Sequence, residues 1–358
     1  MRRVRAAAPL FVIFALLPLG SSWAWNLTGH RWIALDALSD TASLRQSVSW
    51  RNFLVRGAVL WRPVVVASFL LAMTVSQSQA QTVRVVTFNL LHGGPWSGLI
   101  GNGADLNERL DIAVEQLAAL RPDVVALQEA SVGGKRGNVA ERLGRALGVE
   151  WIHAPTTSQV FGIGWLDRAI TSAIRFNEGP AILSRFPIVS SEIVALPRCA
   201  NRLFPRVLLR AKVRTPHGPL DFYSTHTSRD DCQIRRVGEL VRARRGPLPA
   251  VVAGDFNTRE NADAYAELLG AGFVDAFRAV NPAAAGPTSR QQVHAGKSTV
   301  SRRIDFVFVV PGANGMARVL ESRVVLDIPR RRADGATLWP SDHYGVLAVI
   351  EIPTNAAN

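Results

Sequence analysis

From Val83 onward, short runs of β-branched and apolar residues alternate with segments whose apolar residues recur at helical spacing. Residues 83–91 (VRVVTFNLL) predict a strand, and residues 106–120 place Leu110, Ala113 and Leu117 on one helical face. An Arg-Pro-Asp stop separates that helix from the apolar run 124–128, which predicts a second strand. A strand, a helix and a strand in this order are typical of an α/β domain.

The same alternation continues towards the end of the chain. Further strands are predicted at 181–184, 207–213, 220–225, 250–254, 304–310 and 345–352. Further helices are predicted at 139–147, 232–244 and 261–269. The glycine-rich residues 93–103 form an irregular segment that either faces a substrate or simply connects two elements, and residues 283–289 and 333–336 are expected to be exposed loops.

Residues 1–80 contain two tandem segments with the pattern of an export signal. The first, residues 6–24, follows three arginines, is almost wholly apolar and ends in small residues suited to cleavage. The second, residues 56–80, combines arginines with the apolar run 64–73 and a small-residue end. Each apolar run is shorter than the roughly 20 residues of a membrane-spanning helix, so export signals are favoured over two such helices. We expect a periplasmic or secreted protein, or one anchored by an uncleaved N-terminal segment.

Residues 25–50, between the two signals, resemble the mature start of the secreted zinc nucleases and related zinc phospholipases C. The resemblance rests on Trp25-Asn26-Leu27-Thr28-Gly29-His30 and would make Trp25 and His30 zinc ligands. A trinuclear zinc site needs many more His and Asp ligands, but His30 is the only histidine before His92. We interpret the segment as a truncated remnant or fusion without zinc chemistry, and a chance match is the alternative.

The charge of the chain is strongly positive. Its 41 Lys and Arg against 28 Asp and Glu give +13, which favours a polyanionic partner such as nucleic acid or an anionic membrane. Residues 1–80 hold eight arginines and two aspartates, so they account for +6 and residues 81–358 for the remaining +7. Nearly half of this signal therefore comes from the export signals and linker. With 48% hydrophobic and 19% charged residues, a mainly disordered chain is excluded.

The two cysteines, Cys199 and Cys232, belong to no CxxC motif and to no Cys/His cluster with zinc spacing. A structural zinc site built on cysteine is therefore excluded. In an exported protein the pair could form a disulfide, whereas in a reducing compartment both would be thiols.

Eight polar residues stand at or just beyond the ends of otherwise apolar runs: Asn89, Glu129, His226, Asp255, Asn257, Asp305, Asp342 and His343. Any one of them could simply cap a turn or a helix. Seven of them fall into five ordered motifs: Thr87-Phe88-Asn89, Leu127-Gln128-Glu129, Gly254-Asp255-Phe256-Asn257, Arg303-Ile304-Asp305 and Ser341-Asp342-His343. Two further segments lie between them: Gly179-Pro180-Ala181-Ile182-Leu183-Ser184-Arg185-Phe186-Pro187-Ile188 and Ser224-Thr225-His226.

This ordered set resembles the endonuclease/exonuclease/phosphatase superfamily, which includes pancreatic-type deoxyribonucleases, abasic-site endonucleases, neutral sphingomyelinases and inositol-polyphosphate 5-phosphatases. The resemblance extends over about residues 83–353. It implies an α/β fold in which two packed mixed β-sheets flanked by helices form a four-layer sandwich. It also implies that residues 81–358 are one catalytic domain that hydrolyses phosphoric esters.

Hydrolysis of a phosphate ester requires neutralisation of charge on the phosphoryl group, an activated water and a stabilised leaving oxygen. Mg²⁺ suits this chemistry because it prefers oxygen ligands, keeps several waters and needs only one or two protein carboxylates. Glu129 with Asn89 fits such a site, and Asp342 would complete it from the other side. We expect Mg²⁺ as the cofactor, with Mn²⁺ as the alternative.

The resemblance assigns the other five residues to catalysis. It pairs Asp305 with His343, and a carboxylate beside a histidine fixes its tautomer and favours the imidazolium. Asp255 would orient or deprotonate the attacking water, and Asn257 would position that water or the phosphate. His226 would donate a hydrogen bond to a non-bridging phosphate oxygen.

Three further residues are weaker candidates. Arg206 and Arg210 could reach a phosphate or could equally be solvated. His92 could line the cleft. The abasic-site branch has a carboxylate near this point, where this chain has Leu91 and His92. That departure counts against the DNA-repair branch and favours a single metal held mainly by Glu129.

We expect an exported, Mg²⁺-dependent phosphodiesterase that is monomeric and has no obligate protein partner. Two substrate classes stay open. Basicity favours nucleic acid, although no recognition helix or aromatic stacking series is evident. Export and the segment Phe161-Gly162-Ile163-Gly164-Trp165 favour a phospholipid headgroup at a membrane surface, although such a segment is also common in protein cores. The alternative from another class, a non-catalytic membrane-anchored binding protein that keeps only the fold, predicts loss of a motif, and none is lost.

Overall fold

The computed structural model describes residues 82–92, 103–156, 163–199, 205–216 and 218–353. The predicted export signals, Trp25 and His30 lie outside these residues, as do most of the glycine-rich segment and Phe161 with Gly162. No helix within the described ranges is long and apolar enough to cross a membrane.

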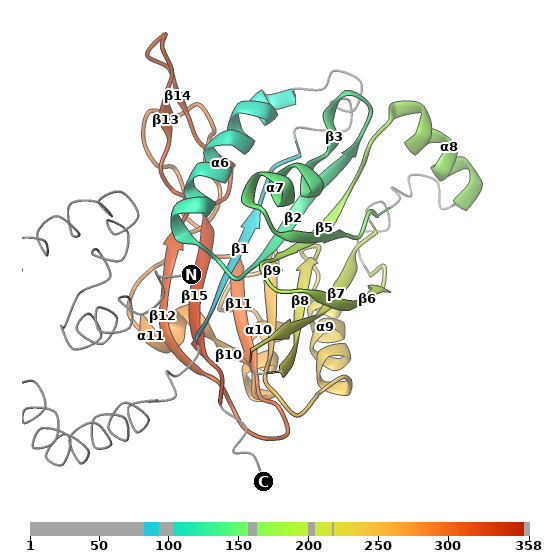
Figure 1. Ribbon diagram of the computed structural model, residues 1–358, viewed down its shortest axis with the longest axis vertical. Coiled ribbons are helices and arrows are strands. Elements are labelled where there is room, and N and C mark those ends of the chain that lie inside the picture. Colours follow the sequence, from blue (N-terminus) through green and yellow to red (C-terminus); the bar gives the residue numbers. More distant parts are fainter. Residues whose placement is uncertain (1–81, 93–102, 157–162, 200–204, 217, 354–358) are drawn as a thin grey trace, which may run out of the picture. The chain divides into compact units, whose positions relative to one another are not determined.

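Two mixed β-sheets form the centre of the described region (Figure 1). The strands of the first sheet follow the order β12-β15-β1-β2-β5-β4, with β3 paired to β2. Those of the second follow β10-β11-β9-β8-β7-β6, and β13 and β14 form a separate hairpin. The strands are β1 (Thr82–Asn89), β2 (Val124–Gly133), β3 (Gly137–Asn138), β4 (Glu150–His153), β5 (Asn177–Ser184), β6 (Ile188–Ala195), β7 (Val207–Thr215), β8 (Gly218–His226), β9 (Ala250–Asp255), β10 (Val274–Asp275), β11 (Asp305–Val310), β12 (Arg318–Val325), β13 (Arg330–Arg331), β14 (Thr337–Leu338) and β15 (Gly345–Glu351).

Helices cover the outer faces of both sheets. The α-helices are α6 (Leu106–Leu120), α7 (Val139–Leu147), α8 (Gly164–Ile174), α9 (Asp231–Ala243), α10 (Asp263–Gly270) and α11 (Ala276–Val280), and short 3-10 turns lie at Gly103–Asp105 and Gly134–Arg136. Helices α6 and α7 lie over the first sheet, and α9 and α10 lie over the second (Figure 1).

Three apolar layers hold this arrangement together. Inward-facing residues of both sheets form the central layer, for example Val85 of β1 and Val251 of β9. Their neighbours along the same strands face outward, so that Val86 packs under α6 and α7 while Val252 packs under α9 and α10. Strands buried on both faces need continuous apolar runs, which is why the sequence shows runs rather than strict alternation. The predicted four-layer sandwich is confirmed.

Strand direction brings the polar strand ends to one edge. Strands β1 and β2 are parallel, with Asn89 beside Gln128, and β8 and β9 are parallel, with His226 beside Asp255. Strand β11 is antiparallel to β9 and begins with Asp305 opposite Asp255. One edge therefore holds the carboxyl ends of β1 and β2, the carboxyl ends of β8 and β9, and the amino end of β11.

Where sequence and structure differ, the difference lies mainly at sheet edges. The prediction placed no strand at β6 or β12, which lie at edges and are partly exposed, so their sequences carry no continuous apolar run. The predicted exposed loop 283–289 is wrong at its end, because Thr288 and Ser289 are buried. The loop turns inward there because Thr288 donates a hydrogen bond to the buried Asp305.

A disulfide joins Cys199, which follows β6, to Cys232 in the first turn of α9, with 6.5 Å between their Cα atoms. This separation lies within the usual range for disulfides. The bond ties the chain segment before β7 to the helix that follows His226, so it closes a loop around one side of the polar edge.

Gly254 immediately precedes Asp255 and lies against strand β8. A Cβ atom at this position would come within 2.1 Å of the Thr225 carbonyl oxygen. We predict that Gly254→Ala destabilises the protein by roughly 1–3 kcal/mol or more, because one strand of the parallel pair must move. Urea unfolding followed by circular dichroism measures this effect.

Gly296→Ala is the matched control, since a Cβ atom there meets nothing within 4 Å. We expect it to change the free energy of unfolding by less than about 0.5 kcal/mol. Equal stability of the two variants would contradict the close strand approach at Gly254.

Candidate active site

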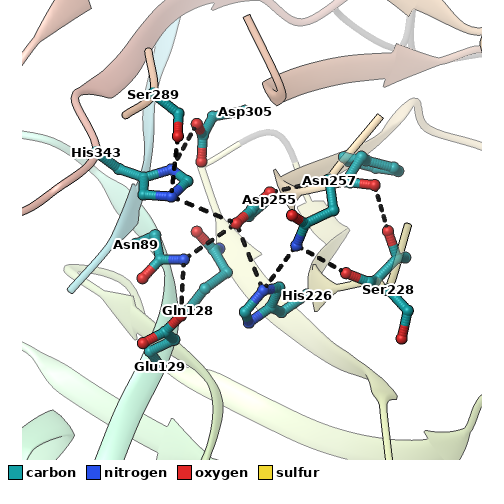
Figure 2. Close-up of polar contacts among 12 residues, drawn as sticks. Asn89, Gln128, Glu129, His226, Ser228, Asp255, Asn257, Ser289, Asp305 and His343 are labelled. Carbon is teal, nitrogen blue, oxygen red and sulfur yellow. Dashed lines mark hydrogen bonds and ion pairs between the residues drawn. The ribbon is translucent and has the colours of Figure 1, made fainter. Parts of the chain in front are cut away.

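Asp255, at the end of β9, is the centre of the polar edge (Figure 2). Its carboxylate is 1% exposed, and Oδ2 lies 3.1 Å from Asn89 Nδ2, 3.4 Å from His226 Nε2 and 3.8 Å from His343 Nε2. The backbone N–H of Asn257 donates to Oδ1 at 2.8 Å. Burial and the nearby Asp305 carboxylate raise the pKa of Asp255 to about 7.

His343 is held by a second buried carboxylate. Its Nδ1 lies 2.9 Å from Asp305 Oδ2, and the hydroxyl of Thr288 donates to the same oxygen at 2.6 Å. On the other side of the ring, Ser289 Oγ lies 3.4 Å from Nε2. Burial alone would lower the pKa of His343, but the Asp305 and Asp255 carboxylates outweigh it and hold this pKa well above its usual value. These two carboxylates therefore favour the imidazolium form of the ring.

His226 has the opposite electrostatic environment. Burial and the Arg206 guanidinium hold its pKa well below the usual value, so the ring is neutral. Arg206 Nη1 lies 3.0 Å from Nδ1. Because a guanidinium can only donate, Nδ1 accepts and the ring proton lies on Nε2, facing Asp255. Nδ2 of Asn257 also lies 3.0 Å from this Nε2, but both atoms carry protons in this tautomer, so the contact is no hydrogen bond, and Nδ2 donates to the Thr227 carbonyl at 3.0 Å.

Glu129 reaches the site through an irregularity in β2. The pairing of β2 with β5 shifts between Leu127 and Ala130, and Glu129 has a φ of 56°. A bulge of this kind redirects a side chain beside an active site. One carboxylate oxygen of Glu129 lies 3.3 Å from Asn89 Nδ2, and the other accepts the backbone N–H of His92 at 3.1 Å. Burial alone would raise the pKa of Glu129, but the imidazole and the backbone N–H of His92 outweigh it and bring this pKa to about 2.

The structure thus joins seven of the eight predicted residues in one contact network, with Asn89 linking Glu129 to Asp255. Asp342 lies beside this network rather than in it. Its Oδ1 lies 3.4 Å from Ser341 Oγ, and burial raises its pKa. Of the two weaker arginine candidates, Arg206 reaches the site, whereas Arg210 pairs with Asp221 on β8 and does not.

Sequence reasoning missed the residues that hold the site in place. Arg109 of α6 is fully buried and donates to the backbone carbonyls of Leu90, Leu91 and Pro340, so it joins the loops that carry His92 and Asp342. Gln128 and Ser224 join the two sheets behind the site, with Nε2 donating to Oγ at 3.3 Å. Gln128 and Ser224 stand within the segments 127–129 and 224–226, which was their only sequence signal.

The donor atoms suit a divalent cation. The ligand atoms of Asp255, Asp305 and His343 all lie within 4.8 Å of one another, but His343 could bind an ion only in its deprotonated form, so the carboxylates are the donors of this cluster. Oδ1 of Asp305 is buried and has no hydrogen-bond partner among the described residues. Glu129 stays ionised at neutral pH and offers a further carboxylate, whereas Asn89 turns its Nδ2 towards Glu129 and its Oδ1 accepts the backbone N–H of Leu91 at 3.1 Å. Carboxylate and amide oxygens are the ligands that Mg²⁺ and similar ions prefer.

Comparison with known protein families agrees with this geometry. Residues 86–343, which span every predicted site residue, match the Endonuclease/Exonuclease/phosphatase family. The chain belongs to this family. As a member of the Endonuclease/Exonuclease/phosphatase family it is a hydrolase of phosphoester bonds. None of the curated proteins matches the chain at a significant level.

Several solved structures share the fold. An endonuclease/exonuclease/phosphatase from Beutenbergia cavernae is 23% identical, with 77% of this chain and 73% of that chain covered and a TM-score of 0.55. A mannosyl-6-phosphatase from Bacteroides thetaiotaomicron is 19% identical, with 76% and 99% covered and a TM-score of 0.57. D. rerio TDP2 complexed with single strand DNA product is 19% identical, with 75% and 99% covered and a TM-score of 0.56. At these identities the likeness shows the fold.

Because the pKa of Asp255 is raised, we predict that its ionised carboxylate destabilises the folded, metal-free protein. The folded state binds this proton more tightly than the unfolded chain, so the contribution of Asp255 to stability falls as the pH rises from about 4 to about 7. Asp255→Asn removes that ionisation. The rise of this pKa from 3.8 to about 7 corresponds to about 4 kcal/mol. Since each kcal/mol shifts the melting temperature by roughly 2–4 °C, we expect that of the variant in EDTA at pH 8 to exceed that of the wild type by roughly 8 °C or more.

The gain should be much smaller at pH 5, and differential scanning fluorimetry over this pH range measures it. Asp334→Asn, in the exposed β13–β14 turn, is the control and should leave the melting temperature unchanged at both pH values. A lower melting temperature for Asp255→Asn at pH 8 would argue against a strained Asp255 carboxylate.

Proposed function

We propose that this member of the family is a Mg²⁺-dependent phosphodiesterase that hydrolyses its substrate by in-line attack of an activated water. The observation that carries the proposal is the buried Asp255 carboxylate, which contacts a carboxylate-bound imidazolium, a neutral histidine and the Asn89 amide at once. Mn²⁺ is the alternative ion. A non-catalytic binding protein would not need to maintain this buried and electrostatically costly arrangement.

Asp255 is suited to accept the proton of the attacking water. Its pKa of about 7 lies near neutral pH, where a general base is most effective. The neighbouring His343, kept protonated by Asp305, carries a positive charge towards the reacting phosphoryl group. Asn257, whose backbone N–H fixes Asp255, would position the water.

His226 is suited to hold the phosphate. Its neutral ring carries the proton on Nε2, which faces the site and can donate to a non-bridging oxygen. Arg206 sets this tautomer from behind while it also pairs with the half-buried Glu178. Glu129 and Asp342 would hold the metal ion, and Asn89 would join them once its amide oxygen turns from the Leu91 N–H towards the site. That ion would neutralise negative charge on the phosphoryl group and the leaving oxygen.

Surface chemistry favours a phospholipid headgroup as the source of the phosphodiester. Trp165 at the start of α8 is 68% exposed and Ile163 is 46% exposed, while Asp167 is the only buried residue of the helix. Arg168 of the same helix is exposed, and so is Arg175, the residue that follows the helix. Exposed tryptophan with flanking arginines suits the interface of an anionic membrane. Nucleic acid is the second candidate, supported by the likeness to TDP2, which was solved with a single strand DNA product.

Export is part of the same proposal. The two signal-like segments in residues 1–80 support it, and so does the Cys199–Cys232 disulfide, because such bonds persist outside the reducing cytoplasm. A phospholipid substrate and a membrane surface are then both within reach. We propose that the exported protein acts as a monomer without an obligate protein partner.

The test is an assay of the purified protein on vesicles containing sphingomyelin or other phospholipids, on plasmid DNA and on a chromogenic phosphodiester. We expect hydrolysis with Mg²⁺ and loss of hydrolysis in EDTA, with phospholipid preferred over DNA. Preference for DNA would favour the second candidate. Activity that survives EDTA would overturn the metal-dependent mechanism.

His343→Ala should lower kcat by roughly 10²–10³-fold, the usual cost of removing one group that stabilises charge in the transition state. His294→Ala is the matched control, because His294 is exposed and belongs to none of the motifs, and it should retain activity. Activity and melting temperature are measured for both variants. A His343→Ala protein that is folded and as active as the wild type would contradict the site, and an inactive wild type would support the non-catalytic alternative.

A further inference from the structure

His92 lies against the carboxylate that is expected to hold the metal ion. Its Nε2 is 3.4 Å from Glu129 Oε2, and its backbone N–H donates to that same oxygen at 3.1 Å. The side chain of His92 is 24% exposed and that of Glu129 is 17% exposed, so both can be reached from solvent. None of the sequence motifs includes His92, and the family match assigns it no role.

The structure fixes His92 by contacts that do not involve Glu129. The chain turns sharply after β1, with Leu91 at a φ of 53°. Arg109 holds the Leu91 carbonyl at 2.7 Å, and Arg136 holds the His92 carbonyl at 2.8 Å. The imidazole packs edge-on against Phe176, with 5.1 Å between ring centroids. Arg109, Arg136 and Phe176 therefore hold this loop in place. The His92 side chain of the loop faces Glu129.

The distance between the two side chains fits a shared ion better than a direct hydrogen bond. A normal N–H···O bond spans about 2.7–3.2 Å, which is shorter than the 3.4 Å between Nε2 and Oε2. Adjacent ligands on an octahedral ion with bonds of about 2.1 Å lie about 3 Å apart, so a small movement would let both bind one ion. The His92 N–H already orients the carboxylate in the manner of a supporting hydrogen bond around a metal site.

We propose that His92 Nε2 is a ligand of the divalent ion held by Glu129, and that this nitrogen makes the site prefer a first-row transition ion such as Mn²⁺ over Mg²⁺. The proposal rests on the metal dependence proposed above and refines the identity of the ion. Mg²⁺ prefers an all-oxygen environment, whereas imidazole is a common ligand of first-row transition ions. One nitrogen among oxygen donors therefore shifts the relative affinity without excluding Mg²⁺.

The experiment measures metal binding directly, on the full-length protein. Mn²⁺ is titrated by its electron paramagnetic resonance signal, Mg²⁺ affinity is obtained by competition against Mn²⁺, and pulsed measurements detect coupling of bound Mn²⁺ to ¹⁴N. The wild type should show ¹⁴N coupling. In His92→Ala the coupling should disappear, and the ratio of Mn²⁺ to Mg²⁺ affinity should fall at least about tenfold, a loss that even an outer-shell partner can cause.

Two variants separate this role from a structural one. His92→Asp supplies an oxygen ligand, so it should lose the ¹⁴N coupling, keep Mn²⁺ binding and bind Mg²⁺ more tightly than His92→Ala. His294→Ala, at an exposed histidine, should keep both the coupling and the affinity ratio. The melting temperature of each metal-free variant checks its fold, and His92→Gln, with a side chain of similar length, replaces His92→Ala if that variant does not fold.

The outcomes are distinguishable from failure of the proposed function. If wild type and His92→Ala have the same affinity ratio, or if ¹⁴N coupling is absent from the wild type or persists in His92→Ala, His92 is not a ligand, although metal dependence stands. If neither Mn²⁺ nor Mg²⁺ binds to the wild-type protein, metal dependence itself is overturned.

Discussion

The burial of one carboxylate sets the arrangement of the whole site. Asp255 is removed from water between two sheets, so its charge has to be offset by donors that the fold supplies. Asn89 comes from the first sheet and His226 from the second, while His343 reaches it from the segment before β15. These partners can meet only if the two sheets pack with their polar strand ends at the same edge. The catalytic geometry therefore depends on the packing between the sheets.

Two histidines at opposite sides of Asp255 have opposite electrostatics. Asp305 and Asp255 raise the pKa of His343, whereas burial and Arg206 lower that of His226. One ring is thus a cation and the other a neutral donor within the same small volume. Environments that separate the pKa values of neighbouring groups in this way give each group a different role in acid and base chemistry. The difference comes from one carboxylate behind one ring and one guanidinium behind the other.

The site also contains local strain. Glu129 and Asn257 both have positive φ values, of 56° and 50°. Such a conformation costs about 1–3 kcal/mol per residue and persists only where surrounding structure imposes it. Here the three apolar layers and the buried Arg109 supply that constraint. Stability of the sandwich away from the site is what allows the polar edge to keep buried charges and unfavourable backbone angles.

Local sequence patterns were enough to predict the α/β class, helices 106–120 and 139–147, and eight polar strand-end residues, seven of which the structure joins in one network. The sequence could not separate Arg206, which reaches His226, from Arg210, which pairs with Asp221. Nor could it show that buried Thr288 and Arg109 hold the site, that Glu129 enters through a bulge, or that His92 lies beside it. Only the tertiary structure decided these points, since each depends on a contact between segments far apart in the chain or on a strand register that local sequence does not encode.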